Sequence, residues 1–327
     1  MDLELPEELL ARPFASVREA CAEVAARARH VAIEPDALAR FADALPAAEL
    51  GASPTAFPAL GGDVEGLTSY VLCLDALNFG SGWFPHLKKR AGHSGYRTLE
   101  ASLRERFEHA GAFTARDLRA MDPRALAELL GQLPLAPPID ELMELYARAL
   151  RELGECVQLR AAGSFAGFVE EAGGSAAELV RRLLAMPLWR DVARCDGQLV
   201  PFLKRAQLAV SDLAHALPDD LGRFRDLAEL TLFADNLVPH VLRLDGVLRV
   251  TPELAARIEA EETIPAGSAE EVELRACAVD AVEQIAARMR GRGSAVAPRD
   301  LDDWLWRRGG EPRYKARPRH RTRCPFY

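Results

Sequence analysis

Along most of the chain, apolar residues recur three and four positions apart, and Ala, Leu, Glu and Arg dominate the segments between breaks. This spacing places side chains on one face of an α-helix, whereas a strand would show alternation. The clearest helical segments are residues 16–31, 102–110, 139–157 and 270–290. Glycine- and proline-rich groups, where helices should end, occupy 51–58, 61–62, 133–138, 173–174, 265–268 and 291–298. The pattern therefore predicts a mainly α-helical fold.

Strand-like alternation is scarce. Residues 68–79 are ambiguous between helix and strand, and the segment 313–327 is the other candidate for extended chain. A chain of 327 residues, 49% of them hydrophobic, could form one large domain or two ordinary ones. Because the sequence has neither a repeat of fixed period nor a long linker, we predict a single helical domain of two lobes over residues 1–327. Residues 1–60 should be its helical N-terminal part, and 313–327 form a basic C-terminal tail.

Charge is unevenly distributed. The six basic residues of the tail are accompanied by no acidic residue, so residues 1–312 hold 35 basic against 49 acidic residues, a net charge of −14. Such an acidic body disfavours sequence-independent attachment to duplex DNA, which depends on neutralising phosphates with Lys and Arg. A small cationic or hydrogen-bonding ligand suits it better.

Motifs for metals, cofactors and export are missing from the sequence. Its six cysteines form no CxxC pair and do not cluster with the seven histidines, so we expect no disulfide framework, no metal site and no cofactor. The N-terminal residues lack the pattern of a signal peptide, and no apolar stretch approaches the roughly 20 residues of a membrane span. P-loop, HExxH and GxSxG motifs are also missing. We expect a cytoplasmic protein that does not contact membranes.

The apolar run 231–243 is interrupted by Asp235 and Asn236, and then by Pro239 and His240. In a continuous helix Pro239 would supply no N–H to the carbonyl of Asp235, so the helix should be kinked there or should restart. A restart at Pro239 would place Asp235 just before a helix N-terminus, where the helix dipole stabilises a carboxylate. Asp235 is then either a capping residue or a positioned catalytic carboxylate, and both interpretations stay open.

A helical wheel of residues 199–218 separates an apolar arc from a polar one. Lys204, Gln207 and His215 lie on the polar arc, for which a solvated surface is the default expectation. Asp212 lies at the boundary of the two arcs, where a side chain can reach into a cleft beside the core.

Asp75 and Asn78 lie in a strongly apolar stretch, followed by Phe79, a Gly-Ser-Gly turn and Trp83. A buried aspartate needs hydrogen-bond partners or a ligand, and nearby aromatic rings could form a stacking wall for a planar ring. The alternative is that Asp75 caps a helix and that the aromatic residues belong to the core.

The tail carries a basic residue at every second position, so an extended chain would place these charges on one side. They are Arg313, Lys315, Arg317, Arg319, Arg321 and Arg323. Against an acidic body, the simplest interpretation is a tail docked by charge, with Phe326 and Tyr327 anchoring its end. A phosphate-binding site is the functional alternative.

Seven segments together resemble one family, the queuosine salvage proteins, in the family's order from about residue 60 to the end. They are LDALNFGSGWF (74–84), SGYRTLEASL (94–103), PLWRDV (187–192), FLKRAQLAVSDL (202–213), LTLFADNLVPHVL (230–242), EVELRACAVDAVE (271–283) and HRTRCPFY (320–327). Members of this family release the base queuine from queuosine 5′-phosphate. The resemblance implies a helical fold similar to the helix-hairpin-helix DNA glycosylases, without their DNA-binding role.

The resemblance also implies roles for particular residues. Cleavage of an N-glycosidic bond develops positive charge on the ribose, and Asp235 is the carboxylate expected to stabilise that charge or to deprotonate water. A second carboxylate would hold the amine of queuine, Phe79 would stack on the base, and Lys204 or tail arginines would bind the phosphate. The expected substrate-binding residues are Asp75, Asn78, Phe79, Lys204, Asp212 and His240.

Two other classes of protein are compatible with parts of the sequence. They are a DNA-base glycosylase on the same scaffold and a helical binding module without catalysis. The acidic body argues against the first, and isolated carboxylates within apolar stretches argue against the second. The expected partner is therefore a small nucleotide, queuosine 5′-monophosphate, with no nucleic acid bound directly and with the protein acting as a monomer.

Overall fold

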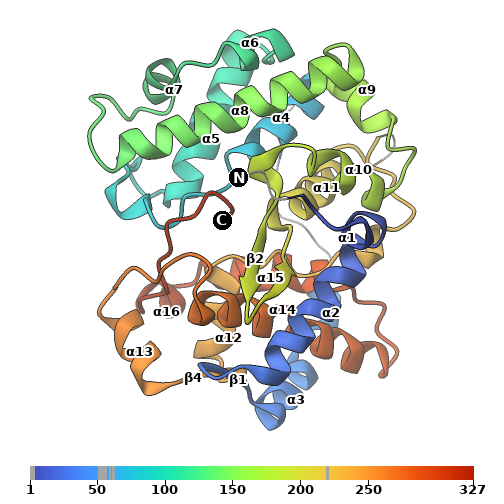
Figure 1. Cartoon of the computed structure of the whole chain (residues 1–327), viewed down its shortest axis with the longest axis vertical. Coiled ribbons are helices and arrows are strands. Elements are labelled where there is room, and N and C mark those ends of the chain that lie inside the picture. Colours follow the sequence, from blue (N-terminus) through green and yellow to red (C-terminus); the bar gives the residue numbers. More distant parts are fainter. Residues whose placement is uncertain (1–3, 51–56, 59, 61–62, 219–220) are drawn as a thin grey trace.

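The structure is a computed structural model that describes residues 4–50, 57–58, 60, 63–218 and 221–327. Within these residues it contains sixteen α-helices and two antiparallel sheets of two short strands each. Figure 1 shows two helical lobes, one above the other, with β2 in the middle of the molecule. The prediction of a mainly α-helical fold is confirmed. Likeness to the helix-hairpin-helix glycosylases stays a prediction.

The upper lobe in Figure 1 is organised around the long helix α8. Its helices are α4 (Val64–Ala76), α5 (Gly95–Ala110), α6 (Ala115–Arg119), α7 (Pro123–Leu129), α8 (Ile139–Ala161), α9 (Phe165–Glu170), α10 (Ala176–Leu183) and α11 (Lys204–Ala216). Leu142, Leu150 and Leu153 of α8 are fully buried where it packs on α4, α6, α7 and α9. Gly154 permits the close approach of α6, because a Cβ there would lie 2.7 Å from the carbonyl oxygen of Ala115.

The lower lobe is built on α14. After α1 (Glu7–Ala11), its helices are α2 (Pro13–Arg27), α3 (Pro35–Ala44), α12 (Leu237–Leu244), α13 (Pro252–Glu259), α14 (Ala269–Arg290), α15 (Pro298–Arg308) and α16 (Pro312–Lys315). Helix α14 packs against α2, α3, α12 and α15. The helical N-terminal part and the C-terminal third of the chain therefore share one core.

The helix predicted over residues 16–31 ends earlier, at Arg27. The backbone N–H groups of Arg29, His30 and Val31 donate to Glu273 Oε2 at 3.0, 2.6 and 3.1 Å. This carboxylate on α14 holds the chain in a non-helical path, a tertiary contact that local periodicity does not report.

Four short strands were not predicted. β1 (Val31–Ile33) pairs with β4 (Leu248–Val250), and β2 (Val192–Cys195) pairs with β3 (Gln198–Pro201). In register, Val31 lies opposite Val250 and Val192 lies opposite Pro201. Strands of three or four residues are too short for alternation to be recognised in the sequence.

Most predicted breaks fall between helices as expected, including those at 133–138, 173–174, 265–268 and 291–298. Most of the break at 51–58, and that at 61–62, lie outside the described residues. The ambiguous segment 68–79 is helical as far as Ala76. Short 3₁₀ turns occupy Ala47–Glu49, Phe84–His86, Pro187–Trp189 and Leu227–Glu229. Among the helices of the described residues, none combines the length and the apolar character that crossing a membrane requires.

Candidate active site

Asp235 lies two residues before the start of α12 at Leu237, in a non-helical segment that runs from residue 230. Its Oδ1 accepts hydrogen bonds from the N–H groups of Leu237 at 2.6 Å and Val238 at 3.2 Å. The predicted helix break is confirmed, but the helix restarts at Leu237, two residues before Pro239. Pro239 is thus within the first turn, where its missing N–H removes no helical hydrogen bond. The capping interpretation is confirmed, and the same bonds fix the orientation of a half-buried carboxylate.

Asp75 lies in the last turn of α4 and is fully buried. Among the described residues, neither of its carboxylate oxygens has a hydrogen-bond partner. The alternative that Asp75 caps a helix is therefore wrong. Burial raises its pKa to about 7, although the positive charge of Lys204 and the neighbouring Asn78 side chain oppose this shift. An unpaired buried carboxylate is costly, and it is a group that a ligand can satisfy.

Lys204 is the first residue of α11, and only 5% of it is exposed. Its Nζ donates to both the main-chain oxygen and the Oδ1 of Asn78, at 3.0 Å each. Burial lowers the pKa of Lys204, and the negative charges of Asp235 and Asp75 partly compensate. The expectation of a solvated surface was wrong here, because the start of α11 lies between the end of α4 and the chain that precedes α12.

Gln207 is buried for a related reason. Its amide donates to the Phe202 carbonyl and to the Thr231 hydroxyl at 2.9 Å each, and its Oε1 accepts from the Thr231 N–H. These bonds join α11 to the segment that leads to Asp235. Gln207, on the polar arc of α11, therefore connects this helix to the segment that carries Asp235.

Asp212 and Asp302 complete a group of four aspartates near Lys204. Asp212, on α11, is 8% exposed, and burial together with the charge of Asp75 raises its pKa well above the ordinary value. Asp302, on α15, is 6% exposed; burial and the charges of Asp303 and Asp235 raise its pKa likewise. We call Asp75, Asp212, Asp235 and Asp302 the aspartate cluster. No group of three or more His, Cys, Asp or Glu side chains placed to hold a metal ion occurs in the described part of the chain.

Asp302 was missed by the sequence analysis. Its Oδ1 accepts a hydrogen bond of 3.1 Å from the N–H of Phe233, two residues before Asp235. A signal for it existed, because Pro298, Leu301, Asp302 and Leu305 form the buried stripe of α15 at helical spacing. A carboxylate on such a stripe faces the core.

Phe79 belongs to the core. Its ring packs edge-to-face on Tyr146 at 4.8 Å between centroids, and the Arg205 guanidinium lies 4.6 Å from the ring centroid. Only 1% of Phe79 is exposed, so this placement does not favour the expected role of stacking on a base. The alternative that the aromatic residues after Asp75 are core residues holds for Phe79 and for Trp83, which is 2% exposed.

A different aromatic pair lies beside the aspartate cluster. Tyr96 on α5 and Trp306 on α15 meet edge-to-face at 5.8 Å, and the guanidinium of Arg97 lies 5.2 Å from the Trp306 ring. Burial raises the pKa of Tyr96 well above its usual value, as do the charges of Asp212 and Asp75. Both rings are half-buried, so they are better placed than Phe79 to contact a planar ligand.

His240 faces the tail. Its Nε2 lies 2.9 Å from the carbonyl oxygen of Tyr314, and burial lowers its pKa to about 4. Within the described residues, its hydrogen bonds and charge interactions involve the tail and α12–α13, and none joins it to Lys204 or Asp75. The structure therefore does not bring His240 together with the other expected substrate-binding residues.

The basic tail is docked on the acidic body. Arg313 pairs with Asp245, Arg317 with Glu259 at 2.9 Å, and Arg321 with Glu261. The tail is not extended throughout, because α16 covers residues 312–315. Burial lowers the pKa of Arg319 in the tail, and the negative charge of Asp235 partly compensates.

The end of the tail reaches the chain that follows α4. Tyr327 is 2% exposed, and its main-chain oxygen accepts a hydrogen bond from the N–H of Gly80 at 3.0 Å. Gly82 has no room for a side chain, because a Cβ there would lie 2.3 Å from the carbonyl oxygen of Thr322. The Gly-Ser-Gly turn thus allows the tail to pack directly against the chain that follows Asn78.

A separate cavity of about 450 Å³ lies between α3 and α15. Its lining includes Phe41 and Trp304, and none of the expected site residues belongs to it. The arginines at its wall are already engaged, since Arg308 pairs with Asp245 and Arg307 donates to the Glu49 carbonyl. The unsatisfied buried carboxylate of Asp75 makes the aspartate cluster the stronger candidate.

Known proteins are similar to this chain over most of its length. A family model described as queuosine salvage protein matches residues 61–327. A Sphaerobacter thermophilus protein named queuosine 5′-phosphate N-glycosylase/hydrolase is 39% identical over 322 residues, which cover 93% of this chain and 95% of that protein. A Mus musculus protein of the same name is 30% identical over 339 residues, covering 96% and 99%. The chain therefore belongs to the queuosine salvage protein family.

Proposed function

We propose that this protein hydrolyses the N-glycosidic bond of queuosine 5′-phosphate and releases queuine for salvage into tRNA modification. The observation that carries the proposal is the aspartate cluster around Lys204, which combines an oriented carboxylate, an unsatisfied buried carboxylate and a buried ammonium group. The names of the relatives in the family support the choice of substrate.

Asp235 is the proposed catalytic residue. As the glycosidic bond breaks, positive charge develops on the ribose, and a fixed carboxylate beside the anomeric carbon stabilises it. The two N–H groups that bind Oδ1 hold the carboxylate in place before substrate arrives. The same carboxylate can take a proton from the attacking water.

Asp75 and Asp212 are the proposed binding residues for the base. Queuine carries an amine that is cationic at neutral pH, and a carboxylate buried without a partner gains most from such a ligand. Tyr96 and Trp306 are the aromatic residues that we expect against the planar ring system, in place of Phe79.

Lys204 is the proposed binding residue for the 5′-phosphate, positioned by Asn78. Among the tail arginines, Arg319 is the alternative, since its charge already interacts with Asp235. Arg313, Arg317 and Arg321 are engaged by surface carboxylates and are poorer candidates. We assign no substrate contact to His240.

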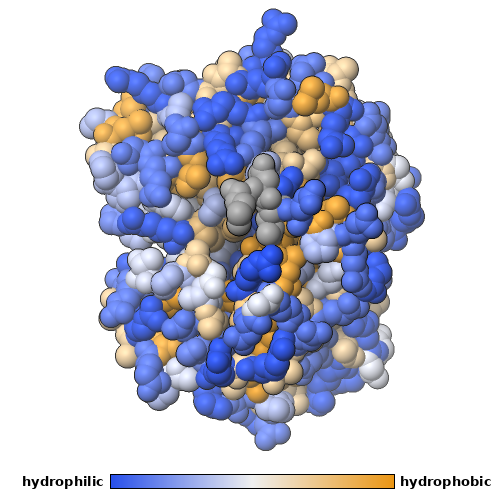
Figure 2. Space-filling model, viewed as in Figure 1, coloured by the Kyte–Doolittle hydropathy of each residue, from blue (hydrophilic) through white to orange (hydrophobic). Residues whose placement is uncertain are grey.

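The proposal includes a single domain over residues 1–327, acting as a monomer in the cytoplasm without direct contact to nucleic acid. The shared core of α2, α3 and α14 supports one domain. Hydrophilic residues cover most of the face drawn in Figure 2, so this face offers no broad hydrophobic surface to a partner subunit. The acidic body supports a small-molecule substrate over duplex DNA.

The test is to incubate the purified protein separately with queuosine 5′-phosphate, queuosine and duplexes containing damaged bases, and to follow released base by chromatography. Release of queuine from the phosphorylated nucleoside is the expected result. Release only from the duplexes would favour a DNA-base glycosylase, and no release from any substrate would favour a binding module.

A further inference from the structure

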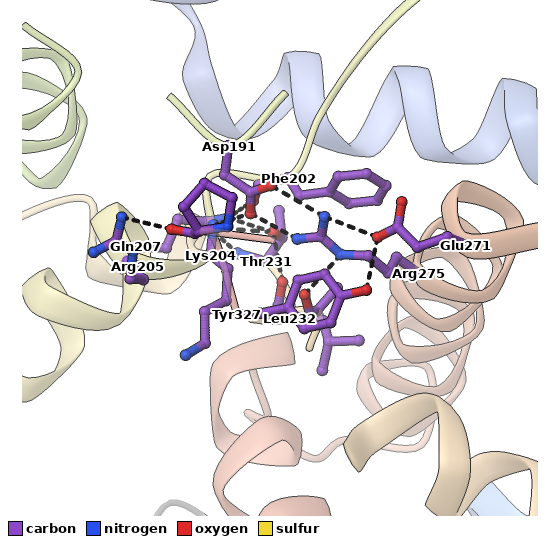
Figure 3. Close-up of polar contacts among 12 residues, drawn as sticks. Asp191, Phe202, Lys204, Arg205, Gln207, Thr231, Leu232, Glu271, Arg275 and Tyr327 are labelled. Carbon is purple, nitrogen blue, oxygen red and sulfur yellow. Dashed lines mark hydrogen bonds and ion pairs between the residues drawn. The ribbon is translucent and has the colours of Figure 1, made fainter. Parts of the chain in front are cut away.

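Arg275, in the middle of α14, is buried and bonded through all three of its guanidinium nitrogens. Nη1 and Nη2 donate to the two oxygens of Asp191 at 3.0 and 2.6 Å, and Nε donates to the carbonyl of Ala234 at 3.0 Å. Figure 3 shows the guanidinium between Asp191, Phe202 and Tyr327. The Ala234 carbonyl belongs to the residue immediately before Asp235, so one end of this network fixes the chain that carries the proposed catalytic carboxylate.

Asp191 extends the network to Lys204. Its Oδ2 also accepts the N–H of Lys204 at 3.0 Å, and its main-chain oxygen accepts the N–H groups of Phe202 and Leu203 at 2.9 and 3.1 Å. Leu203 has a positive φ of 55°, a conformation that is strained for a branched side chain and needs support from its surroundings. Asp191 therefore determines where α11 begins and how Lys204 is presented.

The third branch runs to the tail. Glu271 Oε1 lies 3.5 Å from Arg275 Nη1 and accepts a 2.9 Å hydrogen bond from the hydroxyl of Tyr327. The Tyr327 ring centroid lies 4.5 Å from the guanidinium carbon of Arg275. The main-chain oxygen of Tyr327 accepts a hydrogen bond from the N–H of Gly80. Gly80 is two residues after Asn78, which holds the Lys204 ammonium.

We propose that Arg275 is a positioning residue that holds Lys204, Asp235 and the chain after Asn78 in the arrangement needed for the reaction, with Asp191 and Tyr327 as its intermediaries. This inference rests on the proposed function. Any buried guanidinium needs partners for its N–H groups, so the number of bonds alone does not indicate a role. Each branch of this network instead ends on the backbone of a segment that carries a site residue.

Arg275→Lys is the informative change. It keeps the positive charge beside Asp191 but cannot form the planar, two-pronged contact and the Nε bond to Ala234 at the same time. Arg182→Lys is the matched control, because Arg182 is also buried, pairs with Glu171 and lies 4.8 Å from the Phe168 ring, away from the aspartate cluster.

The experiment measures kcat and KM for queuosine 5′-phosphate, thermal melting, and hydrogen–deuterium exchange by mass spectrometry. Loss of a supporting contact behind a site typically costs about 10- to 100-fold in activity, so we expect kcat of Arg275→Lys to fall by that factor with KM changed less than about threefold. Exchange should quicken in residues 202–207 and 231–238. Arg182→Lys should lower the melting temperature without either effect.

The inference is overturned if Arg275→Lys and Arg182→Lys have equally lowered melting temperatures, the same kcat, and the same exchange rates in residues 202–207 and 231–238. If wild type releases no queuine, the proposed function fails, while the exchange comparison still decides whether Arg275 holds the two segments.

Tyr327→Phe keeps the ring but removes the bond to Glu271, and Tyr314→Phe, which loses a tail hydroxyl bound to Asp245, is its control. Should Arg275→Lys fail to fold, a lower kcat in Tyr327→Phe than in Tyr314→Phe supports the inference, and equal kcat overturns it.

Discussion

The ammonium nitrogen of Lys204 lies 3.0 Å from both the main-chain and the side-chain oxygen of Asn78, joining the start of α11 to the chain that leaves α4. Neutral oxygens orient the ammonium group without cancelling its charge. The negative charges of Asp235 and Asp75 both act on that ammonium group, so a buried cation is held near two carboxylates of the aspartate cluster. A phosphate group arriving there would find a positive charge that is already positioned.

Lys204→Met tests this role. If Lys204 binds the 5′-phosphate, the variant should lose on the order of 100-fold in kcat/KM for queuosine 5′-phosphate and much less for queuosine, because only the phosphorylated substrate uses the charge. Lys315→Met, at an exposed position of α16, is the control. Equal losses for both substrates would show that Lys204 supports the site without contacting phosphate.

Asp235→Asn separates capping from catalysis. Asparagine retains an Oδ1 that can accept the N–H groups of Leu237 and Val238, and it is as good an N-cap as aspartate. We therefore expect near-normal melting but a loss of about 100-fold or more in kcat, since electrostatic transition-state groups contribute several kcal/mol. Asp235→Ala should in addition lose about 1 kcal/mol of stability with its cap. Near-normal queuine release by Asp235→Asn in single-turnover assays would remove Asp235 from the mechanism.

Asp75→Asn should change how stability depends on pH. Burial raises the pKa of Asp75 to about 7, whereas aspartate in an unfolded chain titrates at about 3.9. A raised carboxyl pKa means that its contribution to stability is fully present below the unfolded value and is lost as pH rises through the folded value. The melting temperature of the variant minus that of wild type should therefore increase between about pH 4 and about pH 7. Melts of Asp36→Asn, an exposed substitution, provide the control, and a difference for Asp75→Asn that is constant with pH would contradict the expectation.

Much of the fold follows from local periodicity, because long amphipathic segments such as α8 and α14 bury whichever face is apolar. What periodicity misses is set by distant residues. The early end of α2 depends on Glu273 binding the backbone of Arg29 to Val31, and the strands are too short to carry a pattern. Local sequence reports the preference of a segment, while tertiary hydrogen bonds decide its boundary.

For a similar reason, the sequence indicated the surroundings of some candidate site residues and not of others. Asp75 and Asp235 were singled out because carboxylates in apolar stretches are unusual, and Asp212 because it lies at the boundary between the apolar and polar arcs of its helix. Lys204 was expected on a solvated face because a helical wheel does not show a second segment covering the polar arc. Likewise, Phe79 could not be separated from Tyr96 as a candidate ring, since only the packing of Tyr146 and Arg205 on Phe79 reveals that it is enclosed.

The tail arginines allow a last test, of docking against phosphate binding. Arg321 pairs with Glu261 on the surface, whereas Arg323 is exposed and has no ion pair among the described residues. Arg321→Gln should therefore lower stability by about 0.2–1 kcal/mol, less at high salt, because exposed ion pairs are weak and screened. Arg323→Gln, the matched control, should melt like wild type. For a docked tail the ratio of kcat/KM for queuosine 5′-phosphate to that for queuosine should be unchanged in both variants. A fall in that ratio for either one would mean that its guanidinium contacts the phosphate, and the assignment of that contact to Lys204 would then have to be revised.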